Sequence, residues 1–293
     1  MATTAEWVQG ARLRTLPMAL APVIAGTAAA QSVWGADALR AALAFAVALA
    51  LQVGVNYAND YSDGIKGTDD NRVGPMRLVG SGTATARQVL AAAVICFALA
   101  MVAGLALTVV SRQWWFLVIG ASAVLAAWGY TGGRRPYGYR GFGDLAVFLY
   151  FGPVAVLGTA LTQAGELNGV AWVGAVATGL FACALLMVNN IRDIPGDREV
   201  GKLTLAVRLG DRWARIVFAA ELGLGFALHL FLIPGNPWFL LVLLALPLAV
   251  AASRTVLFAT RRTALIPVLK QCGILNLVWS VLFFAAVLVH QAV

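Results

Sequence analysis

Long apolar runs with almost no charge constrain this chain more than any other feature of its sequence. Hydrophobic residues make up 61% of its 293 residues, charged residues make up only 12%, and the mean hydropathy is +0.83. Several runs are about 18–22 residues long, which is the length that an α-helix needs to cross a bilayer. A barrel would instead show alternating stretches of about ten residues, and the sequence contains none. The sequence therefore predicts an all-α integral membrane protein, because helices satisfy their own backbone hydrogen bonds within lipid.

The runs predict nine transmembrane helices, packed as a helical bundle in one domain that covers residues 1–293. Two long polar segments, 58–87 and 192–212, interrupt the apolar pattern. The expected helices cover roughly residues 16–34, 39–57, 88–110, 114–131, 144–162, 170–191, 213–232, 238–257 and 270–290.

The distribution of positive charge predicts the orientation of these helices. With nine helices, the N-terminus and every second connection share one side of the membrane, and this side holds 19 of the 21 Lys and Arg residues. Only Arg40 and Arg112 remain on the other side. Because positive residues gather in cytoplasmic loops, we expect a multi-pass protein of a bacterial-type cell membrane, with a cytoplasmic N-terminus, cytoplasmic polar segments and an external C-terminus. The same rule accounts for the net charge of +8 without a nucleic-acid partner.

The first polar segment opens with a cluster of acidic residues directly after an apolar run. Asn59 and Asp63 are four positions apart, so they share one face if the second helix continues through them. Asp60 adds a carboxylate beside them, and Asp69 and Asp70 follow after two glycines at which the chain can turn back. This cluster lies where a membrane helix meets water.

The second polar segment repeats this arrangement after the sixth expected helix. Asn189, Asp193 and Asp197 are spaced i, i+4 and i+8, which places them on one helix face. Pro195 is expected to distort the helix before Asp197. We interpret the echo between the two segments as a pseudo-repeat that brings both clusters to face each other across a shared central cavity.

Oxygen ligands of this kind suit a hard divalent cation, Mg²⁺ or also Mn²⁺, that binds a few carboxylates together with phosphate oxygens. The candidate metal ligands are Asp60, Asp63, Asp69, Asp193 and Asp197. Basic and polar residues around them suit the phosphate oxygens of a lipid diphosphate. These candidate substrate-binding residues are Asn59, Lys66, Arg72, Arg77, Tyr130, Arg134, Arg135, Asn189, Asn190 and Arg198, together with Lys202.

Two motifs in this chain resemble the aspartate-rich motifs of the UbiA superfamily of membrane prenyltransferases. They are Asn59-Asp60-x-x-Asp63 and Asp193-x-x-x-Asp197, the latter followed by Gly201-Lys202. Within that superfamily, four further stretches resemble the branch that acts on 1,4-dihydroxy-2-naphthoate. These are Arg14 to Pro17, Asn59 to Asp69, Tyr130 to Tyr139 and Asn189 to Ala206.

The resemblance implies a fold, a reaction and a set of catalytic residues. It implies a UbiA-type bundle of nine helices in which Asp63, Asp193, Asp197 and Lys202 are catalytic. It also implies Mg²⁺-dependent transfer of a polyprenyl group from polyprenyl diphosphate to 1,4-dihydroxy-2-naphthoate, with loss of CO2 and diphosphate, to give demethylmenaquinol in menaquinone biosynthesis. The prenyl tail would lie among the helices in contact with membrane lipid.

The chain departs from the family pattern at two positions, and two rival functions stay open. Gly67 stands where the family often has a third aspartate, so either Asp69 or Asp70 completes the first metal site. Either Arg134 or Arg135 takes the place of the basic residue that follows Tyr130. One rival function is prenyl transfer to another acceptor, such as 4-hydroxybenzoate or haem. The other is ion transport, which would favour ionisable groups near the bilayer midplane.

Overall fold

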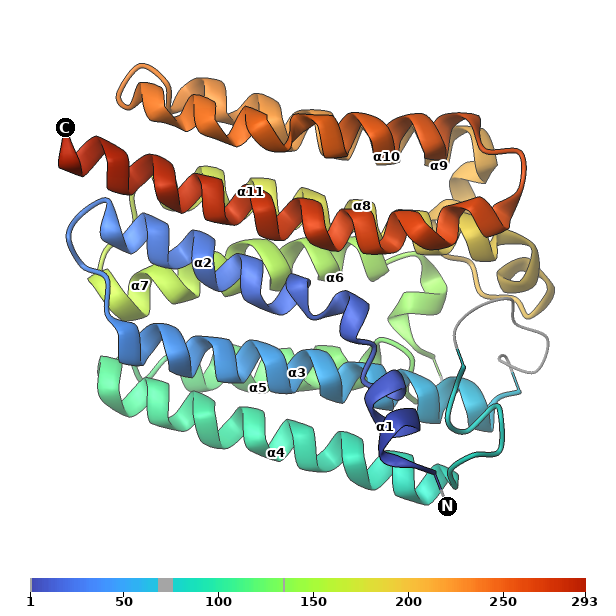
Figure 1. Cartoon of the computed structure of the whole chain (residues 1–293). Coiled ribbons are helices and arrows are strands. Elements are labelled where there is room, and N and C mark those ends of the chain that lie inside the picture. Colours follow the sequence, from blue (N-terminus) through green and yellow to red (C-terminus); the bar gives the residue numbers. More distant parts are fainter. Residues whose placement is uncertain (1, 68–75, 134) are drawn as a thin grey trace.

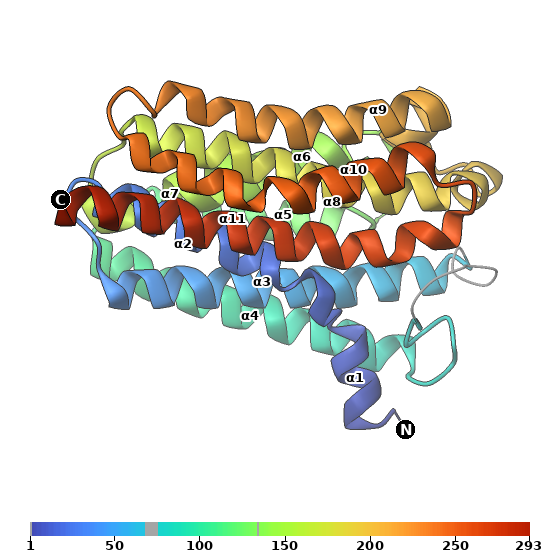
Figure 2. The ribbon, with the colours of Figure 1, turned by 45° about the horizontal axis from the view of Figure 1, so that its top comes forward.

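The computed structural model describes residues 2–67, 76–133 and 135–293, and within these residues every regular element is a helix, with no β-strand. The helices run roughly parallel to one long axis, and the two termini lie at opposite ends of the bundle (Figures 1 and 2). In chain order the elements are α1 Thr4–Gly10, η1 Leu13–Thr15, α2 Pro17–Gln31, α3 Ala38–Ile65, α4 Ala86–Ser111, α5 Phe116–Gly129, η2 Tyr137–Arg140, α6 Gly143–Leu149, η3 Tyr150–Leu157, α7 Gly158–Ala164, α8 Gly169–Glu199, α9 Leu205–Ala227, η4 Leu228–Phe231, η5 Pro237–Ala245, α10 Leu246–Phe258, η6 Arg262–Leu265 and α11 Ile266–Ala292.

The predicted class is confirmed, but the predicted count of nine transmembrane helices is slightly too high. Across the described ranges, seven helices are long and apolar enough to cross a membrane. An eighth is added if the bent pair Thr4–Thr15 and Pro17–Gln31 forms one span. The segment expected at 114–131 contains only the 14-residue helix α5. At 1.5 Å per residue α5 covers about 21 Å, which is less than the bilayer core of about 30 Å.

The helices α3 and α8 are longer than their apolar runs, so the predicted ends at residues 57 and 191 are wrong. The helix α3 continues to Ile65 and α8 continues to Glu199. A glycine with positive φ follows each end, Gly67 at +69° and Gly201 at +72°, in the left-handed region where glycine stops a helix at little cost. Asn59 to Asp63 and Asn189 to Asp197 are therefore helical. We call the end of the bundle at which α3 and α8 finish the acidic end.

The expected distortion at Pro195 is also wrong, because α8 stays helical through this residue. Proline has no N–H group, so it leaves the carbonyl oxygen of Ile191 without its usual donor. The guanidinium of Arg262, at the start of η6, donates to this oxygen. Arg262 also forms an ion pair with Asp211 over 3.1 Å, and Asp211 pairs in turn with Arg215 over 2.7 Å. An arginine from a later connection thus completes the hydrogen bonding of α8.

The bundle divides into two packed halves. A large apolar core surrounds α8, which packs against α9 and α11, and its fully buried side chains include Phe181 and Trp279. A smaller core lies where α3 packs against α4 and α5, around Leu78 and Val89. The helix α2 contacts both α3 and α8 and thereby bridges the two halves.

The contact between Arg262 and Ile191 yields a stability prediction. Replacing Arg262 with alanine leaves the Ile191 carbonyl unsatisfied and breaks the pair with Asp211. Loss of a partner for a buried polar group costs about 1–3 kcal/mol, so we expect a lower melting temperature in detergent. Arg261→Ala is the matched control, because Arg261 is exposed and makes no ion pair with a described residue. Equal melting temperatures for the two variants would contradict the role given to Arg262.

Candidate active site

The described part of the first acidic cluster, Asn59 to Asp63, lies in the last two turns of α3 and is buried. Asn59, Asp60 and Asp63 are 7%, 1% and 5% exposed. Because α3 is continuous, Asn59 and Asp63 share one face, and both line a cavity. The side chain of Thr131 donates to Asn59 Oδ1 over 2.6 Å, and Lys66 Nζ donates to the Thr131 carbonyl over 2.6 Å. The end of α3 is thus tied to the turn that follows α5.

Asp60 faces another direction from Asn59 and Asp63. Its carboxylate oxygens accept hydrogen bonds from the backbone N–H groups of Leu78 and Val79, over 2.8 and 3.1 Å. Asp60 was predicted as a metal ligand, but it is not among the described residues that line the cavity. These contacts anchor the segment that carries Arg77, a predicted substrate-binding residue that does line the cavity.

Tyr139 joins the two acidic clusters. Its hydroxyl donates to Asp63 Oδ1 over 2.7 Å. The Nζ atoms of Lys66 and Lys202 lie 4.9 and 5.2 Å from the centre of its ring, within the range of cation–π attraction. Lys202 also forms an ion pair with Asp197 over 3.5 Å. The short helix η2, from Tyr137 to Arg140, therefore places one aromatic ring between residues of both predicted motifs.

The second cluster contains a buried arginine to which the sequence analysis gave no role. Arg192 is 4% exposed, and it donates from Nε and Nη2 to the two carboxylate oxygens of Asp193, both over 2.7 Å. Its Nη2 atom also donates to Asn189 Oδ1 over 2.9 Å. This two-pronged geometry fixes the orientation of Asp193. Asn189, Asn190 and Arg192 line the cavity from the α8 side.

The surroundings of the cluster shift the pKa of two predicted site residues. Burial lowers the pKa of Lys66, the negative charge of Asp63 opposes this shift, and the positive charge of Lys202 adds to it. Burial raises the pKa of Tyr130, and the charge of Asp144 raises it further, followed by smaller contributions that include Asp63 and Asp197. Tyr130 therefore keeps its hydroxyl proton and can act as a neutral donor towards the cavity that it lines.

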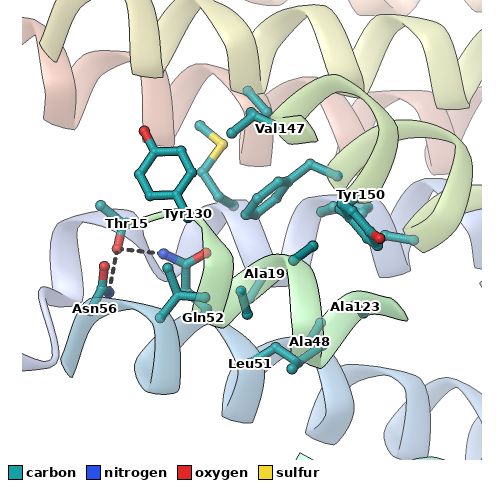
Figure 3. A pocket seen from close by; sticks show the side chains of 18 of the residues that line it. Thr15, Ala19, Ala48, Leu51, Gln52, Asn56, Ala123, Tyr130, Val147 and Tyr150 are labelled. Carbon is teal, nitrogen blue, oxygen red and sulfur yellow. Dashed lines mark hydrogen bonds between the residues drawn. The ribbon is translucent and has the colours of Figure 1, made fainter. Parts of the chain in front are cut away.

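The cavity has a volume of about 690 Å³ and extends between the two halves of the bundle. Its α3 wall includes residues from Ala44 to Asp63, a distance of about 28 Å at 1.5 Å per residue. Figure 3 shows small and apolar side chains such as Ala48 and Leu51 along this wall, and Tyr130 near one end. The cavity therefore combines a long apolar channel with a charged end.

The structure gathers most of the predicted site residues at the acidic end but not all of them. The gathered residues are Asn59, Asp63, Lys66, Arg77, Tyr130, Asn189, Asn190, Asp193, Asp197 and Lys202. Arg135 and Arg198 are exposed, and neither is among the described residues that line the cavity. Asp69, Asp70, Arg72 and Arg134 lie outside the described residues. Within the described ranges, no three His, Cys, Asp or Glu side chains form a ready-made metal site.

Tyr139 and Arg192 are site residues that the sequence did not predict. Tyr139 lies in the stretch Tyr130 to Tyr139 that carried the family resemblance, and Arg192 lies directly before Asp193. The position of Arg192, directly before the predicted metal ligand Asp193, could have indicated its role.

Comparison with known proteins identifies the family of this chain. The model of the UbiA prenyltransferase family matches residues 19–269. The chain belongs to the UbiA prenyltransferase family. This confirms the superfamily that its two aspartate motifs resemble.

Similar proteins of known name extend this result over nearly the whole chain. A 1,4-dihydroxy-2-naphthoate octaprenyltransferase of Mycobacterium tuberculosis is 52% identical over 96% of this chain and 96% of its own length. The Escherichia coli protein of the same name is 39% identical over 98% of this chain and 96% of its own length. A solved structure of a UbiA homolog from Archaeoglobus fulgidus, bound to DMAPP and Mg²⁺, has the same fold, with a TM-score of 0.64, 15% identity, and coverage of 97% of this chain and 99% of that one.

The different partners of Asp60 and Asp63 yield a second stability prediction. Asp60→Asn turns an amide NH₂ towards one of two backbone N–H donors, so we expect a loss of about 1–3 kcal/mol of stability, seen as a lower melting temperature. Asp63→Asn keeps a side-chain oxygen for the Tyr139 hydroxyl, so its melting temperature should change much less. An unchanged melting temperature for Asp60→Asn would show that Asp60 does not anchor the segment of Leu78 and Val79.

Proposed function

We propose that this protein transfers a polyprenyl group from polyprenyl diphosphate to 1,4-dihydroxy-2-naphthoate, with loss of CO2 and diphosphate, to give demethylmenaquinol. The observation that carries the proposal is a long apolar cavity that ends at two acidic clusters and several cations. This shape complements a lipid with a long apolar tail and a diphosphate head. The similarity to the relatives named as 1,4-dihydroxy-2-naphthoate octaprenyltransferases supports the acceptor and a polyprenyl donor.

The carboxylates at the acidic end fit Mg²⁺. Mg²⁺ prefers one or two carboxylates for each ion, completed by substrate phosphate oxygens, so one ion at each acidic cluster fits these side chains. Asp63, Asp193 and Asp197 would hold the metal, Mn²⁺ would use the same oxygen ligands, and Asp69 remains a further candidate ligand. When bound, the metal neutralises charge on the diphosphate leaving group. The Mg²⁺ in the homolog from Archaeoglobus fulgidus supports this assignment.

The side chains at the acidic end bind the donor and protect the reaction. Lys66, Arg77 and Lys202 offer N–H donors to the phosphate oxygens, and the ring of Tyr139 keeps the two lysines beside Asp63. The allylic C–O bond then ionises, and its electron pair leaves with the diphosphate. The apolar wall of the cavity excludes water, which would otherwise capture the allylic cation.

The acceptor ring completes the reaction without an added base. The ring carbon that carries the carboxylate attacks the allylic cation and forms the new C–C bond. The bond to the carboxylate then breaks, CO2 leaves, and the electron pair of that bond restores the aromatic ring. This carbon loses CO2 rather than a proton, so no base is needed to remove a proton from it.

We also propose that the acidic end faces the cytoplasm of a bacterial-type cell. The basic residues of the connections at this end support that orientation under the positive-inside rule. The N-terminal helix α1 lies at the acidic end and the C-terminus lies at the opposite end (Figure 1). A cytoplasmic site would receive a water-soluble aromatic acid directly, while the lipid donor enters from the membrane.

The acceptor assignment is tested with membranes that contain the protein. Incubation with a labelled polyprenyl diphosphate and Mg²⁺ should give labelled lipid product with 1,4-dihydroxy-2-naphthoate, and none with 4-hydroxybenzoate or haem. A chelator should abolish the product, and added Mg²⁺ should restore it. Product formed only with 4-hydroxybenzoate would move the protein to another branch of the same family.

The role of the acidic clusters is tested by removal of single charges. Asp63→Asn and Asp193→Asn should each lower the rate of prenyl transfer at least about 100-fold, the scale seen when one group that stabilises a charged transition state is lost. Asp37→Asn is the matched control, because Asp37 caps the far end of α3 and asparagine caps helices equally well. Metal-dependent transfer that survives either change at the acidic end would contradict the assigned metal ligands.

A further inference from the structure

A second polar group lies in the cavity, away from the carboxylates. Thr15 from η1 and Gln52 and Asn56 from α3 line the cavity together with Arg12. Figure 3 shows Thr15, Gln52 and Asn56 joined by hydrogen bonds on the same side of the pocket as Tyr130. The donor-binding mechanism above uses none of these four residues.

The hydrogen bonds of this group engage its amide nitrogens and leave its amide oxygens as acceptors. Gln52 Nε2 and Asn56 Nδ2 both donate to Thr15 Oγ1, over 3.0 and 3.2 Å, and Asn56 Nδ2 also donates to the Ala11 carbonyl over 2.9 Å. Thr15 in turn donates to the Arg12 carbonyl over 2.9 Å. Because the amide nitrogens are engaged, Gln52 Oε1 and Asn56 Oδ1 remain as acceptors, and no described residue donates to them. They suit a ligand with O–H donors.

Arg12 adds a cation beside this group. Its backbone has φ of +56°, a left-handed conformation that costs a non-glycine residue on the order of 1 kcal/mol and that clusters at functional sites. Its side chain lines the cavity, and its Nη2 atom is buried with no hydrogen-bond partner among the described residues. A buried guanidinium nitrogen of this kind calls for an anionic partner, because an unsatisfied charged donor is costly.

The position of the group separates it from the diphosphate site. Gln52, Asn56, Asn59 and Asp63 follow the spacing i, i+4, i+7 and i+11, so they form one stripe along α3. At 1.5 Å per residue, Asn56 lies about 10 Å and Gln52 about 16 Å from Asp63 along the helix. A ligand held here would therefore lie beside the reacting end of a donor whose diphosphate is at the acidic end.

We propose that this group binds the aromatic acceptor, with Arg12 on its carboxylate and the carbonyl oxygens of Gln52 and Asn56 on its two phenolic hydroxyls. The inference rests on the proposed function and identifies the acceptor half of the same site. A diphosphate ester has few O–H donors at neutral pH, so it would not use the two amide oxygens. The reaction removes the carboxylate as CO2, so the product no longer contains the group that Arg12 binds, which favours product release.

The test measures KM for each substrate separately, with the full-length protein in membranes. Arg12→Gln should raise the KM for 1,4-dihydroxy-2-naphthoate about 10- to 100-fold, the value of a hydrogen bond to a charged group, and change the KM for polyprenyl diphosphate less than about 2-fold. Arg12→Lys should restore part of the loss, and Gln52→Met should raise the same acceptor KM. Arg87→Gln is the matched control, because Arg87 is exposed on the first turn of α4 and outside the cavity.

A second measurement isolates the contact to the carboxylate. 1,4-Dihydroxynaphthalene lacks this group, so as a competitive inhibitor it should bind wild-type protein more weakly than the natural acceptor, and Arg12→Gln should not weaken it further. A larger KM for the donor instead of the acceptor would assign Arg12 to the diphosphate, and unchanged KM values would remove it from both sites. If wild-type protein fails to prenylate the naphthoate but binds it with an Arg12-dependent affinity in calorimetry, the proposed reaction fails while the binding site stands.

Discussion

The hydroxyl of Tyr139 on Asp63, together with the two lysines beside its ring, holds the ends of α3 and α8 in one site. These helices come from opposite halves of the bundle, and their acidic residues are about 130 positions apart in the chain. Lys202 extends the connection to Asp197 through its ion pair. The orientation of Asp63 and the closeness of the two lysines depend on this junction. The functional end of the molecule is therefore a tertiary assembly, and neither acidic segment forms it alone.

Buried charge at this junction is balanced within the protein. Asp193 receives two hydrogen bonds from Arg192, Asp197 pairs with Lys202, and the carboxylate of Asp63 accepts from Tyr139. A carboxylate in a site of low polarity is strongly destabilised without such partners. In the proposed reaction, Mg²⁺ would balance these carboxylates, and Lys202 would then be able to bind phosphate oxygens instead of Asp197.

Local patterns predicted the membrane class, the two acidic clusters and the family, because apolar run length and i, i+4 spacing are properties of the sequence itself. They did not predict contacts between residues that are far apart in the chain. Two such contacts join residues that are 18 or more positions apart: Asp60 accepts from the backbone of Leu78 and Val79, and Arg262 donates to the Ile191 carbonyl. Apolar run length also misjudged α5, because residues at its predicted ends form turns in the folded chain. Gln52 and Asn56 share one face of α3 but showed no motif, and only the folded chain brings Arg12 to the cavity that they line.

The shortness of α5 has a consequence for the surrounding lipid. This helix lines the cavity with Phe116, Ile119 and Ala123, yet it is about 9 Å shorter than the hydrocarbon core that its neighbours cross. A bilayer adapts to such a mismatch by local thinning, at a modest cost for each ångström. In a bilayer, headgroups beside α5 would therefore lie deeper than those beside the longer helices. A lipid diphosphate that diffuses in the membrane would meet the protein at this thinned region. Its charged head would there lie closer to the level of the cavity.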